Sequence, residues 1–472
     1  MIGDINLAME NLQSGIDRAE KCPFRPRYHF LPTAYWMNDP NGPIFYEGEY
    51  HLFYQHNPYK DNFKQNEWWE MCWGHAKSSD LVHWKHLPLA IIPSHENGED
   101  GCWSGACVIN NGVPTIIYTS VSKNTPSHEY AEQWMAISRD GMITWEKSVN
   151  NPILTLGQNS PYEIHDWRDP CVWKEKDKWY MILGGHEHKS PTKSYAIVLI
   201  YESSDLTKWQ LKGTLCRGTR TQGRGWECPN FFSLGENHVL IVSPFKEVIY
   251  SIGKYEDYTF LPGIWNTFDH GKCFYATNTM LDDKNRRILW GWIKGGGSGG
   301  WNGCLSLPRI LTLDINNDLK IKPAKELQKL RKLNLKIENL HIPEGSQYFL
   351  GDFPELTLEI IAELDLSGNE IFGFGFFLDQ QYVGEKLEFD SQKSKITIGK
   401  ENGRLNHQES NKDITFHIFI DRSVIEVFIN YHDCITSRVF PKINTSNGFT
   451  IFSKRGSLNL KKIDIWTLET IW

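Results

Sequence analysis

Three carboxylic acids stand in similar surroundings at widely separated points of the chain. Asp39 lies in Trp36-Met-Asn-Asp-Pro-Asn-Gly42, Asp169 in Asp166-Trp-Arg-Asp-Pro170, and Glu227 in Trp226-Glu-Cys-Pro-Asn230. Each acid has a tryptophan within three residues. Aromatic faces stack on the apolar faces of sugar rings, and carboxylates accept hydrogen bonds from hydroxyl groups. Because glycosidic cleavage commonly uses two carboxyl groups, one as proton donor and one as nucleophile or base, the pattern indicates a carbohydrate-cleaving site.

An acid beside proline, asparagine or glycine is also ordinary turn chemistry, so the acids need elements that bring them together. A unit of turn, short strand, polar turn and apolar strand recurs five times. Its copies span 38–55, 103–119, 168–183, 227–243 and 275–291. Each copy has the residue pattern of a β-hairpin. Five such units, roughly 50–65 residues apart, predict a β-propeller with one sheet per blade.

The five hairpins place one residue of each first strand in nearly the same register. These residues are Asp39, Ser104, Asp169, Glu227 and Tyr275. Equivalent positions of different blades are related by rotation about the central axis. We therefore expect the five side chains to surround one end of the central channel.

A shorter repeat, of the form Ser-x-Asp followed by tryptophan, ends at Trp84, Trp145 and Trp209, and we interpret these tryptophans as packing residues. A second aromatic group adjoins the acids and is expected at the channel mouth. It consists of Trp36, Trp68, Trp103, Trp167, Trp226 and Tyr275.

The predicted fold class is all-β: a five-bladed β-propeller followed by a C-terminal β-sandwich. The predicted parts are an N-terminal helical extension at 1–26, the propeller at 27–322, a helical linker at 323–340 and the sandwich at 341–472. The linker is predicted helical because Pro323 precedes leucines at helical spacing. Alternating strands with frequent turns indicate the sandwich.

Composition excludes several classes of protein. The 472 residues are 40% hydrophobic and 23% charged, with a net charge of −7 spread without charge blocks. These values argue against extensive disorder and against nucleic acid as a partner. No apolar run is long enough for a transmembrane helix, and no signal peptide is evident, so no membrane association is expected. Ten cysteines without a CxxC pair favour free thiols and a cytoplasmic location.

No metal or cofactor is predicted. His186 and His188 could suggest a metal site, but no third ligand lies near them in the sequence. We interpret them as surface or hydrogen-bonded histidines. The sequon Asn444-Thr445-Ser446 matters only if the protein is secreted.

At these motifs the chain resembles glycoside hydrolase family 32, the invertases and fructan hydrolases. The Asn38–Gly42, Arg168–Pro170 and Glu227–Pro229 segments match its three acid motifs in order. Further matches lie at Trp73–Trp84, Trp103–Gly105, Phe274–Ala276, Ile288–Trp292, Trp301–Leu311 and Asp421–Phe428. The resemblance implies a retaining, metal-free β-fructofuranosidase acting on sucrose or short fructo-oligosaccharides.

The resemblance also implies the role of each residue. Asp39 would attack the anomeric carbon, Glu227 would be the acid and base, and Asp169 would bind fructose hydroxyls and stabilise the transition state. Other matched positions line the fructose pocket in the family. They are Asn38, Gln55, Trp68, Trp103, Ser104, Arg168 and Tyr275.

The chain departs from the family pattern at Trp68-Trp69-Glu70, which borders the leaving-group side in relatives. The identity of the leaving group is therefore left open. Sucrose 6-phosphate hydrolase, exo-fructanase and fructosyltransferase are alternatives within the family. An acid at residue 70 argues mildly against a phosphorylated leaving group. More distant alternatives are an inverting five-bladed arabinan or xylan glycosidase and a non-catalytic fructan-binding homologue. The oligomeric state is not predicted.

Overall fold

A computed structural model describes residues 5–62, 69–123, 131–156, 162–190, 193–296, 299–378, 384–406, 413–440 and 447–472. Its contacts divide the chain into two compact units. The first comprises Met1–Cys22, Leu31–Asn266 and Tyr275–Leu305; the second comprises Pro23–Phe30, Thr267–Phe274 and Ser306–Trp472. The predicted boundaries follow chain order, whereas the second unit also takes in two segments from within 23–274. Among the described helices, none combines the length and apolar character needed to cross a bilayer.

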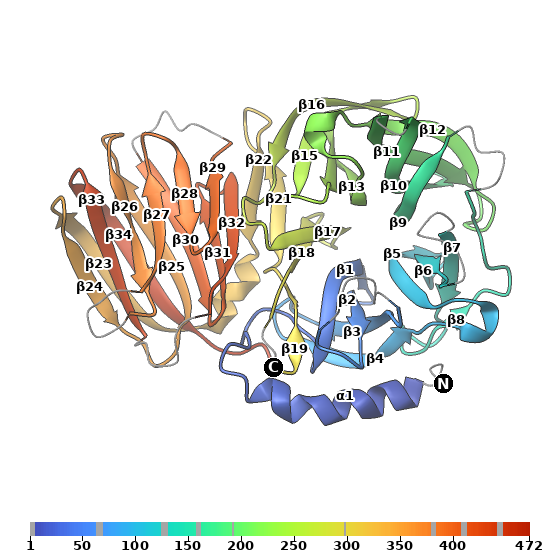
Figure 1. Cartoon of the computed structure of the whole chain (residues 1–472), viewed down its shortest axis with the longest axis horizontal. Coiled ribbons are helices and arrows are strands. Elements are labelled where there is room, and N and C mark those ends of the chain that lie inside the picture. The colour runs from blue at the N-terminus through green and yellow to red at the C-terminus, as the bar shows by residue number, and fades with distance from the viewer. Residues whose placement is uncertain are drawn as a thin grey trace. The chain divides into compact units, whose positions relative to one another are not determined.

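The first unit is built from five successive sheets, coloured blue to yellow in Figure 1. Each of the first four contains four consecutive antiparallel strands. Their bounds are β1 (Tyr35–Tyr46), β2 (Glu49–Asn57), β3 (Cys72–Ser78) and β4 (Lys85–Ile91); β5 (Gly101–Asn110), β6 (Val113–Val121), β7 (Glu132–Ile137) and β8 (Glu146–Lys147); β9 (Ile164–Glu175), β10 (Lys178–Ser190), β11 (Lys193–Ser203) and β12 (Gln210–Arg217); β13 (Glu227–Leu234), β14 (Asn237–Ser243), β15 (Ile249–Glu256) and β16 (Thr259–Thr267). The fifth is built on β17 (Phe274–Leu281) and β18 (Arg287–Ile293), with β20 (Cys304–Leu305) paired to β18. The predicted five-bladed propeller is confirmed.

Ring closure uses a short strand from the end of the unit. The strand β19 (Trp301–Asn302) pairs in parallel with β1, placing Trp301 opposite Tyr35. The first sheet therefore contains chain from both ends of the unit.

The predicted N-terminal extension contains the helix α1 (Ile5–Glu20). Its buried residues Ala8, Leu12, Gly15 and Ala19 lie on one face, as expected of an amphipathic helix. Gly15 is required by close packing, because a Cβ atom there would lie 2.8 Å from the Tyr35 ring. Two 3-10 turns, η1 (His95–Asn97) and η2 (Arg220–Gln222), complete the unit's helical elements in the described residues.

The repeated Ser-x-Asp segments form one type of turn in three blades. In the second blade, Asp140 accepts hydrogen bonds from the backbone N–H groups of Ile143 and Thr144 and from the Ser138 hydroxyl. Asp80 and Asp205 accept equivalent bonds in the first and third blades. Each turn also includes one buried residue with positive φ. This residue is Leu81 in the first blade, Met142 in the second and Leu206 in the third.

The second unit contains two six-stranded sheets, and the predicted β-sandwich is confirmed. One sheet has the order β23-β34-β25-β30-β31-β32 and the other β24-β33-β26-β27-β28-β29. Their bounds are β23 (Arg331–Ile342), β24 (Gln347–Asp352), β25 (Thr357–Asp365), β26 (Ile371–Phe376), β27 (Glu385–Asp390), β28 (Lys395–Ile398), β29 (Glu401–Arg404), β30 (Asp413–Asp421), β31 (Val424–Ile429), β32 (Asp433–Arg438), β33 (Gly448–Arg455) and β34 (Leu458–Leu468). Buried aliphatic and phenylalanine side chains of both sheets form one core, including Ile360, Phe374 and Phe416. The unit also contains the hairpin β21 (Arg309–Leu313) and β22 (Leu319–Pro323).

The helix predicted over 323–340 is largely replaced by a strand. Only Lys325–Leu330 is helical, as the 3-10 turn η3, and β23 begins at Arg331. Residues 333–338 alternate apolar and polar side chains, and β23 pairs with β34 over most of its length. Strand pairing and partial burial of Leu335 and Ile337 therefore outweigh the helical propensity of the Lys- and Leu-rich sequence.

A fully buried charged cluster lies in the second unit. Asp421 accepts hydrogen bonds from the backbone N–H groups of Arg27, Tyr28 and His29, at 2.7 to 2.8 Å. The His29 ring contacts both Asp421 (2.8 Å) and Glu426 (3.0 Å), and Glu426 also pairs with Arg309. Two acids of the Asp421–Phe428 motif thus fasten the Pro23–Phe30 segment within this unit.

Candidate active site

A cavity of about 420 Å³ lies in the first unit and collects residues from all five sheets. Nine of the ten predicted site residues line it, and the tenth, Trp68, lies outside the described residues. The lining consists of Asn38, Asp39, Gln55, Met71, Trp103, Ser104, Arg168, Asp169, Glu227, Cys228, Phe245, Tyr275, Trp292 and Lys294. The five side chains predicted from blade register therefore meet in one cavity, together with four that the family resemblance implies.

Irregularities in the first strands coincide with the lining residues. Register shifts interrupt the pairing of β1 between Met37 and Pro40, of β5 between Cys102 and Gly105, and of β13 between Glu227 and Asn230. A bulge bends a strand and redirects a side chain. Asp39 and Ser104 lie inside the interrupted stretches, and Glu227 is the last paired residue before the shift in β13.

Asp39 is held by three donors. The Ser104 hydroxyl donates to one carboxylate oxygen at 2.6 Å, and the Asn38 amide donates to the other at 3.0 Å. The Cys228 thiol lies 3.5 Å from Asp39. Asn38 is itself oriented by a 2.8 Å hydrogen bond from the Trp36 indole. The carboxylate is thereby fixed at the cavity wall.

Asp169 lies beside Asp39, and Cys228 contacts both. The Cys228 backbone N–H donates to Asp169 at 2.9 Å, and its thiol lies 3.5 Å from the same oxygen. Asp169 and Cys228 both have positive φ, at 63° and 47°. Non-glycine residues populate this region sparsely, so the surrounding blades must hold both backbones in it.

Glu227 is held by Tyr275 and Arg168. The Tyr275 hydroxyl donates to one oxygen and the Arg168 guanidinium to the other. Tyr275 is fixed in turn by the Ser243 carbonyl, to which its hydroxyl lies at 3.1 Å, and by the Phe245 backbone N–H, which donates at 3.0 Å. The fourth and fifth blades therefore cooperate in placing Glu227.

Arg168 contacts acids on both sides. Besides Glu227, its guanidinium lies 2.9 Å from Asp166 and 3.9 Å from Asp169. It also lies over the Trp103 ring, 5.5 Å from the centroid. One cation thus balances several neighbouring carboxylates.

Burial and mutual repulsion perturb the acids. Burial raises the pKa of Asp169 to about 7; Glu227 and Asp39 add to the rise, and Arg168 opposes it. Burial also raises the pKa of Asp39, although hydrogen bonds from Ser104, Asn38 and Cys228 oppose the rise. Asp169 therefore retains a proton to higher pH than an exposed aspartate does.

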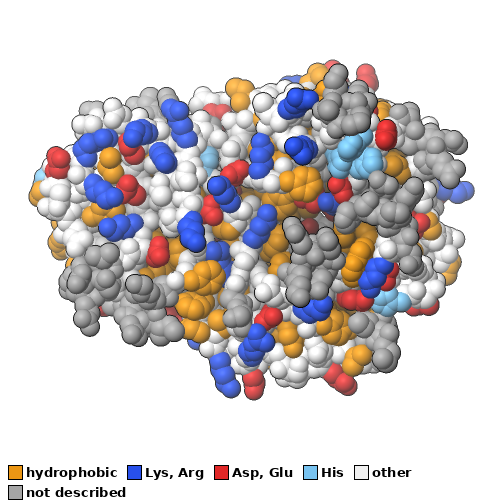
Figure 2. Space-filling model, viewed as in Figure 1, with side chains coloured by type: hydrophobic (Ala, Val, Ile, Leu, Met, Phe, Trp, Pro, Cys, Tyr) orange, Lys and Arg blue, Asp and Glu red, His pale blue; other side chains and the backbone are white. Residues whose placement is uncertain are grey.

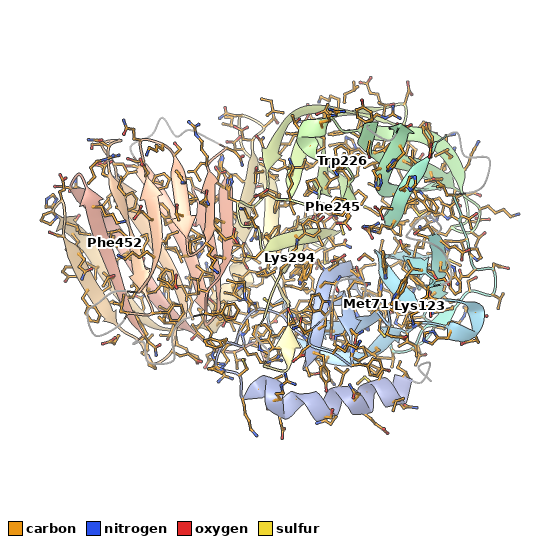
Figure 3. The ribbon with its side chains drawn as sticks, in the orientation of Figure 1. Met71, Lys123, Trp226, Phe245, Lys294 and Phe452 are labelled. Carbon is orange, nitrogen blue, oxygen red and sulfur yellow. The ribbon has the colours of Figure 1, made fainter. Side chains whose placement is uncertain are left out.

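Five lining residues were not assigned to the site from sequence: Met71, Cys228, Phe245, Trp292 and Lys294. Figure 3 shows Met71, Phe245 and Lys294 around the centre of the first unit. Cys228 and Trp292 lie in motifs that the sequence analysis identified, and Lys294 follows Trp292 by two residues. Strand periodicity could have placed Lys294 on the same face as Trp292.

The predicted aromatic group at the channel mouth is only partly formed. Trp103 and Tyr275 line the cavity, whereas Trp167 and Trp226 are 1% exposed and lie in hydrophobic cores of the blades. Their large apolar side chains are buried between sheets, so the expectation for these two residues was wrong. Trp36 does not line the cavity, but its indole donates a hydrogen bond to Asn38, which does.

A propeller whose central cavity brings three acids together has the site expected of a glycosidase. Comparison with family models matches residues 29–323 to the glycosyl hydrolases family 32 N-terminal domain and residues 326–467 to the family 32 C-terminal domain. The chain belongs to glycosyl hydrolase family 32, and it is a glycosidase. Membership of this family removes the arabinan- and xylan-directed alternative.

Individual relatives match over nearly their whole length. A sucrose-6-phosphate hydrolase of Zymomonas mobilis is 33% identical over 484 aligned residues, covering 94% of this chain and 92% of the relative. The crystal structure of fructan 1-exohydrolase IIa from Cichorium intybus superposes with a TM-score of 0.82 at 25% identity, covering 95% of this chain and 98% of that one. A β-fructofuranosidase of Bombyx mori, solved as a mutant in complex with sucrose, superposes with a TM-score of 0.81 at 26% identity. The superposition covers 99% of this chain and 98% of that one.

Proposed function

We propose that the chain is a retaining β-fructofuranosidase that cleaves sucrose or short fructo-oligosaccharides. The observation that carries this proposal is the meeting of Asp39, Asp169 and Glu227, from three blades, in one cavity. Two of these acids share the Cys228 thiol as a neighbour at 3.5 Å. The names of the family relatives, which include a β-fructofuranosidase and a fructan exohydrolase, support the same substrate class.

In the proposed reaction, the Asp39 carboxylate attacks the anomeric carbon of the fructosyl unit. The bond to the leaving oxygen breaks as that oxygen takes a proton from Glu227. Water then gives a proton to Glu227 and attacks the same carbon, which releases fructose and restores Asp39. Two inversions at one carbon retain its configuration.

The surrounding residues suit these steps. Ser104 and Asn38 donate to Asp39 and orient it for attack. In this proposal Asp169 accepts hydrogen bonds from fructose hydroxyls, as the family resemblance implies. Arg168 and Tyr275 hold Glu227, while Gln55 is fixed by its bond to the Cys102 carbonyl at 2.9 Å. Trp103 and Trp292 supply apolar wall.

The test is a hydrolysis panel with purified protein on sucrose, sucrose 6-phosphate, kestose, inulin and levan. Asp39→Asn should lower kcat by roughly 10³-fold or more, because it removes the nucleophile. Asp177→Asn, in an exposed turn between β9 and β10, is the matched control and should keep full activity. Undiminished turnover by Asp39→Asn would refute the assignment, and so would inertness of the wild type toward all five sugars.

Sucrose 6-phosphate is a second candidate substrate, favoured by Lys294. This lysine lines the cavity, with its ammonium group 3.6 Å from the Tyr275 ring centroid and 5.5 Å from that of Trp292. The Zymomonas mobilis relative is named for this activity. From the sequence alone, Glu70 argues mildly against a phosphorylated leaving group. That objection is weakened because Glu70 contacts His95 at 3.0 Å and Lys123 at 3.1 Å, and the lysine balances its negative charge.

Lys294→Gln separates the two substrates. If Lys294 binds a phosphate, kcat/KM should fall about tenfold or more for sucrose 6-phosphate and change little for sucrose, because only the phosphorylated sugar loses a charge-assisted contact. Lys246→Gln, an exposed lysine that does not line the cavity, is the control. An equal loss for both sugars would assign Lys294 to general cavity structure instead.

We also propose a cytoplasmic location, where short sugars and not long polymers are the available substrates. All ten cysteines are free thiols, which suits a reducing compartment. The ratio of fructose to transferred fructosyl product at high sucrose concentration would separate hydrolysis from transfer.

A further inference from the structure

Three histidines of the third blade gather at one place. His186 and His188 lie two residues apart on β10, so their side chains leave the same face of the strand. His165 on β9 is paired directly with His186 across the sheet. The third ligand that was lacking near these histidines in the sequence is therefore supplied by the neighbouring strand.

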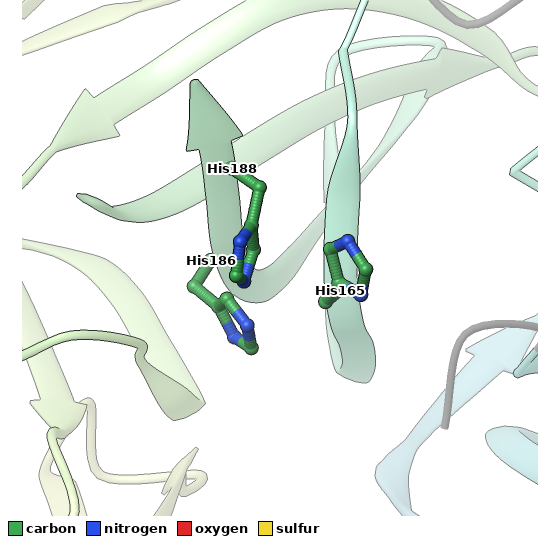
Figure 4. A group of neighbouring side chains, drawn as sticks. All are labelled: His165, His186 and His188. Carbon is green, nitrogen blue, oxygen red and sulfur yellow. The ribbon is translucent and has the colours of Figure 1, made fainter. Parts of the chain in front are cut away.

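The three side chains, which we call the histidine cluster, are shown in Figure 4. Each histidine offers one ring nitrogen as a metal ligand, and the three nitrogens lie within 4.8 Å of one another. The ring centroids are 4.3 Å apart for His165 and His188, 4.8 Å for His186 and His188, and 5.5 Å for His165 and His186. The cluster is partly open, with 17% of the His186 side chain and 27% of the His165 side chain exposed. Histidine side chains also gather at the surface in Figure 2.

We propose that the histidine cluster binds one divalent late first-row metal ion, of which Zn²⁺ is the representative. Neutral imidazoles are preferred ligands of Zn²⁺, Cu²⁺ and Ni²⁺, and three of them leave further coordination positions for water. The sheet fixes the backbones of both strands, so rotation of the side chains is the movement that brings the three nitrogens to one ion.

A carboxylate next to the cluster strengthens the assignment. Asp166 lies 3.3 Å from the Nδ1 atom of His186, and Glu163 lies 4.0 Å from the Nε2 atom of His165. Metal-bound histidines commonly use their second nitrogen to bond a carboxylate, which orients the ring and increases its basicity. With Asp166 on Nδ1, the Nε2 atom of His186 is available to a metal.

The same carboxylate links the cluster to the active site. Asp166 pairs with Arg168 at 2.9 Å, and Arg168 pairs with Glu227. A dication at the cluster attracts Asp166 and weakens its hold on Arg168, which then binds Glu227 and Asp169 differently. Metal binding is therefore expected to lower kcat/KM several-fold; this effect, unlike metal binding itself, rests on the proposed function.

The binding test is calorimetric titration of the full chain, first stripped with a chelator, with ZnCl₂. We expect one Zn²⁺ per chain, with at least tenfold weaker binding in His165→Ala and in His188→Ala. His341→Ala, a histidine of the second unit, is the control and should bind like the wild type. Unchanged affinity in both cluster variants would overturn the site, as would the absence of any saturable binding.

Folding and catalysis are measured separately. Thermal unfolding in chelator should give the same Tm for the wild type and both cluster variants, whereas added Zn²⁺ should raise the Tm of the wild type alone. If a cluster variant is unstable, the absorption spectrum of the Co²⁺-loaded wild type tests imidazole ligation without a mutation; an unperturbed aqueous Co²⁺ spectrum would overturn it. Zn²⁺ binding without a change in sucrose turnover would overturn the link to Arg168 and leave the metal site standing.

Discussion

At the residue scale, the site is controlled by how three acids share one small space. Asp39 is surrounded by donors, Glu227 is held by an arginine and a tyrosine, and Asp169 shares the Cys228 thiol with Asp39. Donors stabilise a carboxylate, whereas burial and neighbouring anions oppose its ionisation. The balance differs at each acid, which allows chemically similar groups to take different roles.

Ser104 should influence the acidic limb of the pH profile through the pKa of Asp39. Burial raises the pKa of Asp39, and the hydrogen bond from Ser104 is the largest influence that lowers it. Ser104→Ala should therefore raise the pKa of Asp39 further and move the acidic limb of kcat/KM to higher pH, because the proposed mechanism needs Asp39 in its ionised form. The measurement is a pH–rate profile on sucrose. Ser251→Ala, a buried serine of β15 outside the cavity lining, should leave the limb in place.

Asp169 should reduce stability at neutral pH. Its pKa rises from 3.8 to about 7 on folding, so between these values the folded state holds a proton that the unfolded state has lost. The contribution of Asp169 to the free energy of unfolding therefore decreases as the pH rises from about 4 to 7, and it is constant above pH 7. Asp169→Asn removes the effect and should stabilise the protein at pH 8, by up to about 4 kcal/mol, while abolishing most activity.

Scanning calorimetry at pH 8 and pH 4 would test this. The Tm of Asp169→Asn should exceed that of the wild type at pH 8, and the difference should shrink at pH 4. Asp177→Asn, which changes an exposed aspartate, is the charge-matched control. A lower Tm for Asp169→Asn at pH 8 would mean that its ionised form stabilises the fold.

At the element scale, the repeated turns explain why three tryptophan-containing segments have similar sequences. The aspartate satisfies backbone N–H groups, the serine supports the aspartate, and the residue with positive φ inserts its side chain into the blade. Trp145 and Trp209 are partly buried against blade cores, as expected of packing residues. The repeat is thus a structural device of the blades, separate from the acids that line the cavity.

Removing one of these aspartates should loosen its blade without affecting the site directly. Asp140→Ala loses several bonds to the backbone and should cost about 1 kcal/mol, comparable to the loss of a helix cap. Hydrogen bonds from Thr144 lower the pKa of Asp140 to about 2, so its contribution is present above pH 4 and is lost as pH falls toward 2. Urea unfolding at pH 7 and pH 2.5 checks both statements, with Asp177→Ala as control.

The elements that could be predicted are those whose pattern and environment agree. Five hairpins were recognised because each strand alternates or is strongly apolar and each turn has turn residues. The segment 331–340 was misassigned because its lysines and leucines favour a helix locally, while its pairing with β34 arises only in the folded unit. The register argument brought Asp39, Asp169 and Glu227 together, but Met71 and Phe245 enter the cavity from outside the regular strands, where register gives no information. His165 was missed because its partners lie across a sheet, beyond the reach of sequence spacing.

At the scale of the whole molecule, the chain crosses between units more than once. The second unit includes Pro23–Phe30 and Thr267–Phe274 as well as the sandwich strands. Asp421 fastens the first of these segments through three backbone N–H groups and the His29 ring. A single buried carboxylate therefore holds a segment that is almost 400 residues away in sequence.

Asp421→Ala should be strongly destabilising, by roughly 3–5 kcal/mol, because it leaves buried donors and a buried histidine without their partner. Asp413→Ala is the control: Asp413 is 70% exposed and pairs with Lys461 at the surface, so its loss should cost less than about 1 kcal/mol. Thermal unfolding of both variants tests the difference. Similar Tm values for Asp421→Ala and the wild type would show that the cluster does not stabilise this unit.

The parallel pairing of Tyr35 with Trp301 has a consequence during protein synthesis. The ribosome makes the chain from the N-terminus, so Asp39, Asp169 and Glu227 all emerge before residue 301 exists. Individual blades can form as they emerge, since most of their strand pairs are local. The ring, however, cannot be fastened until its final segment is translated. The three acids of the cavity are therefore made early and aligned late, and a transcript truncated before codon 301 would encode all three of them without the strand that closes the propeller.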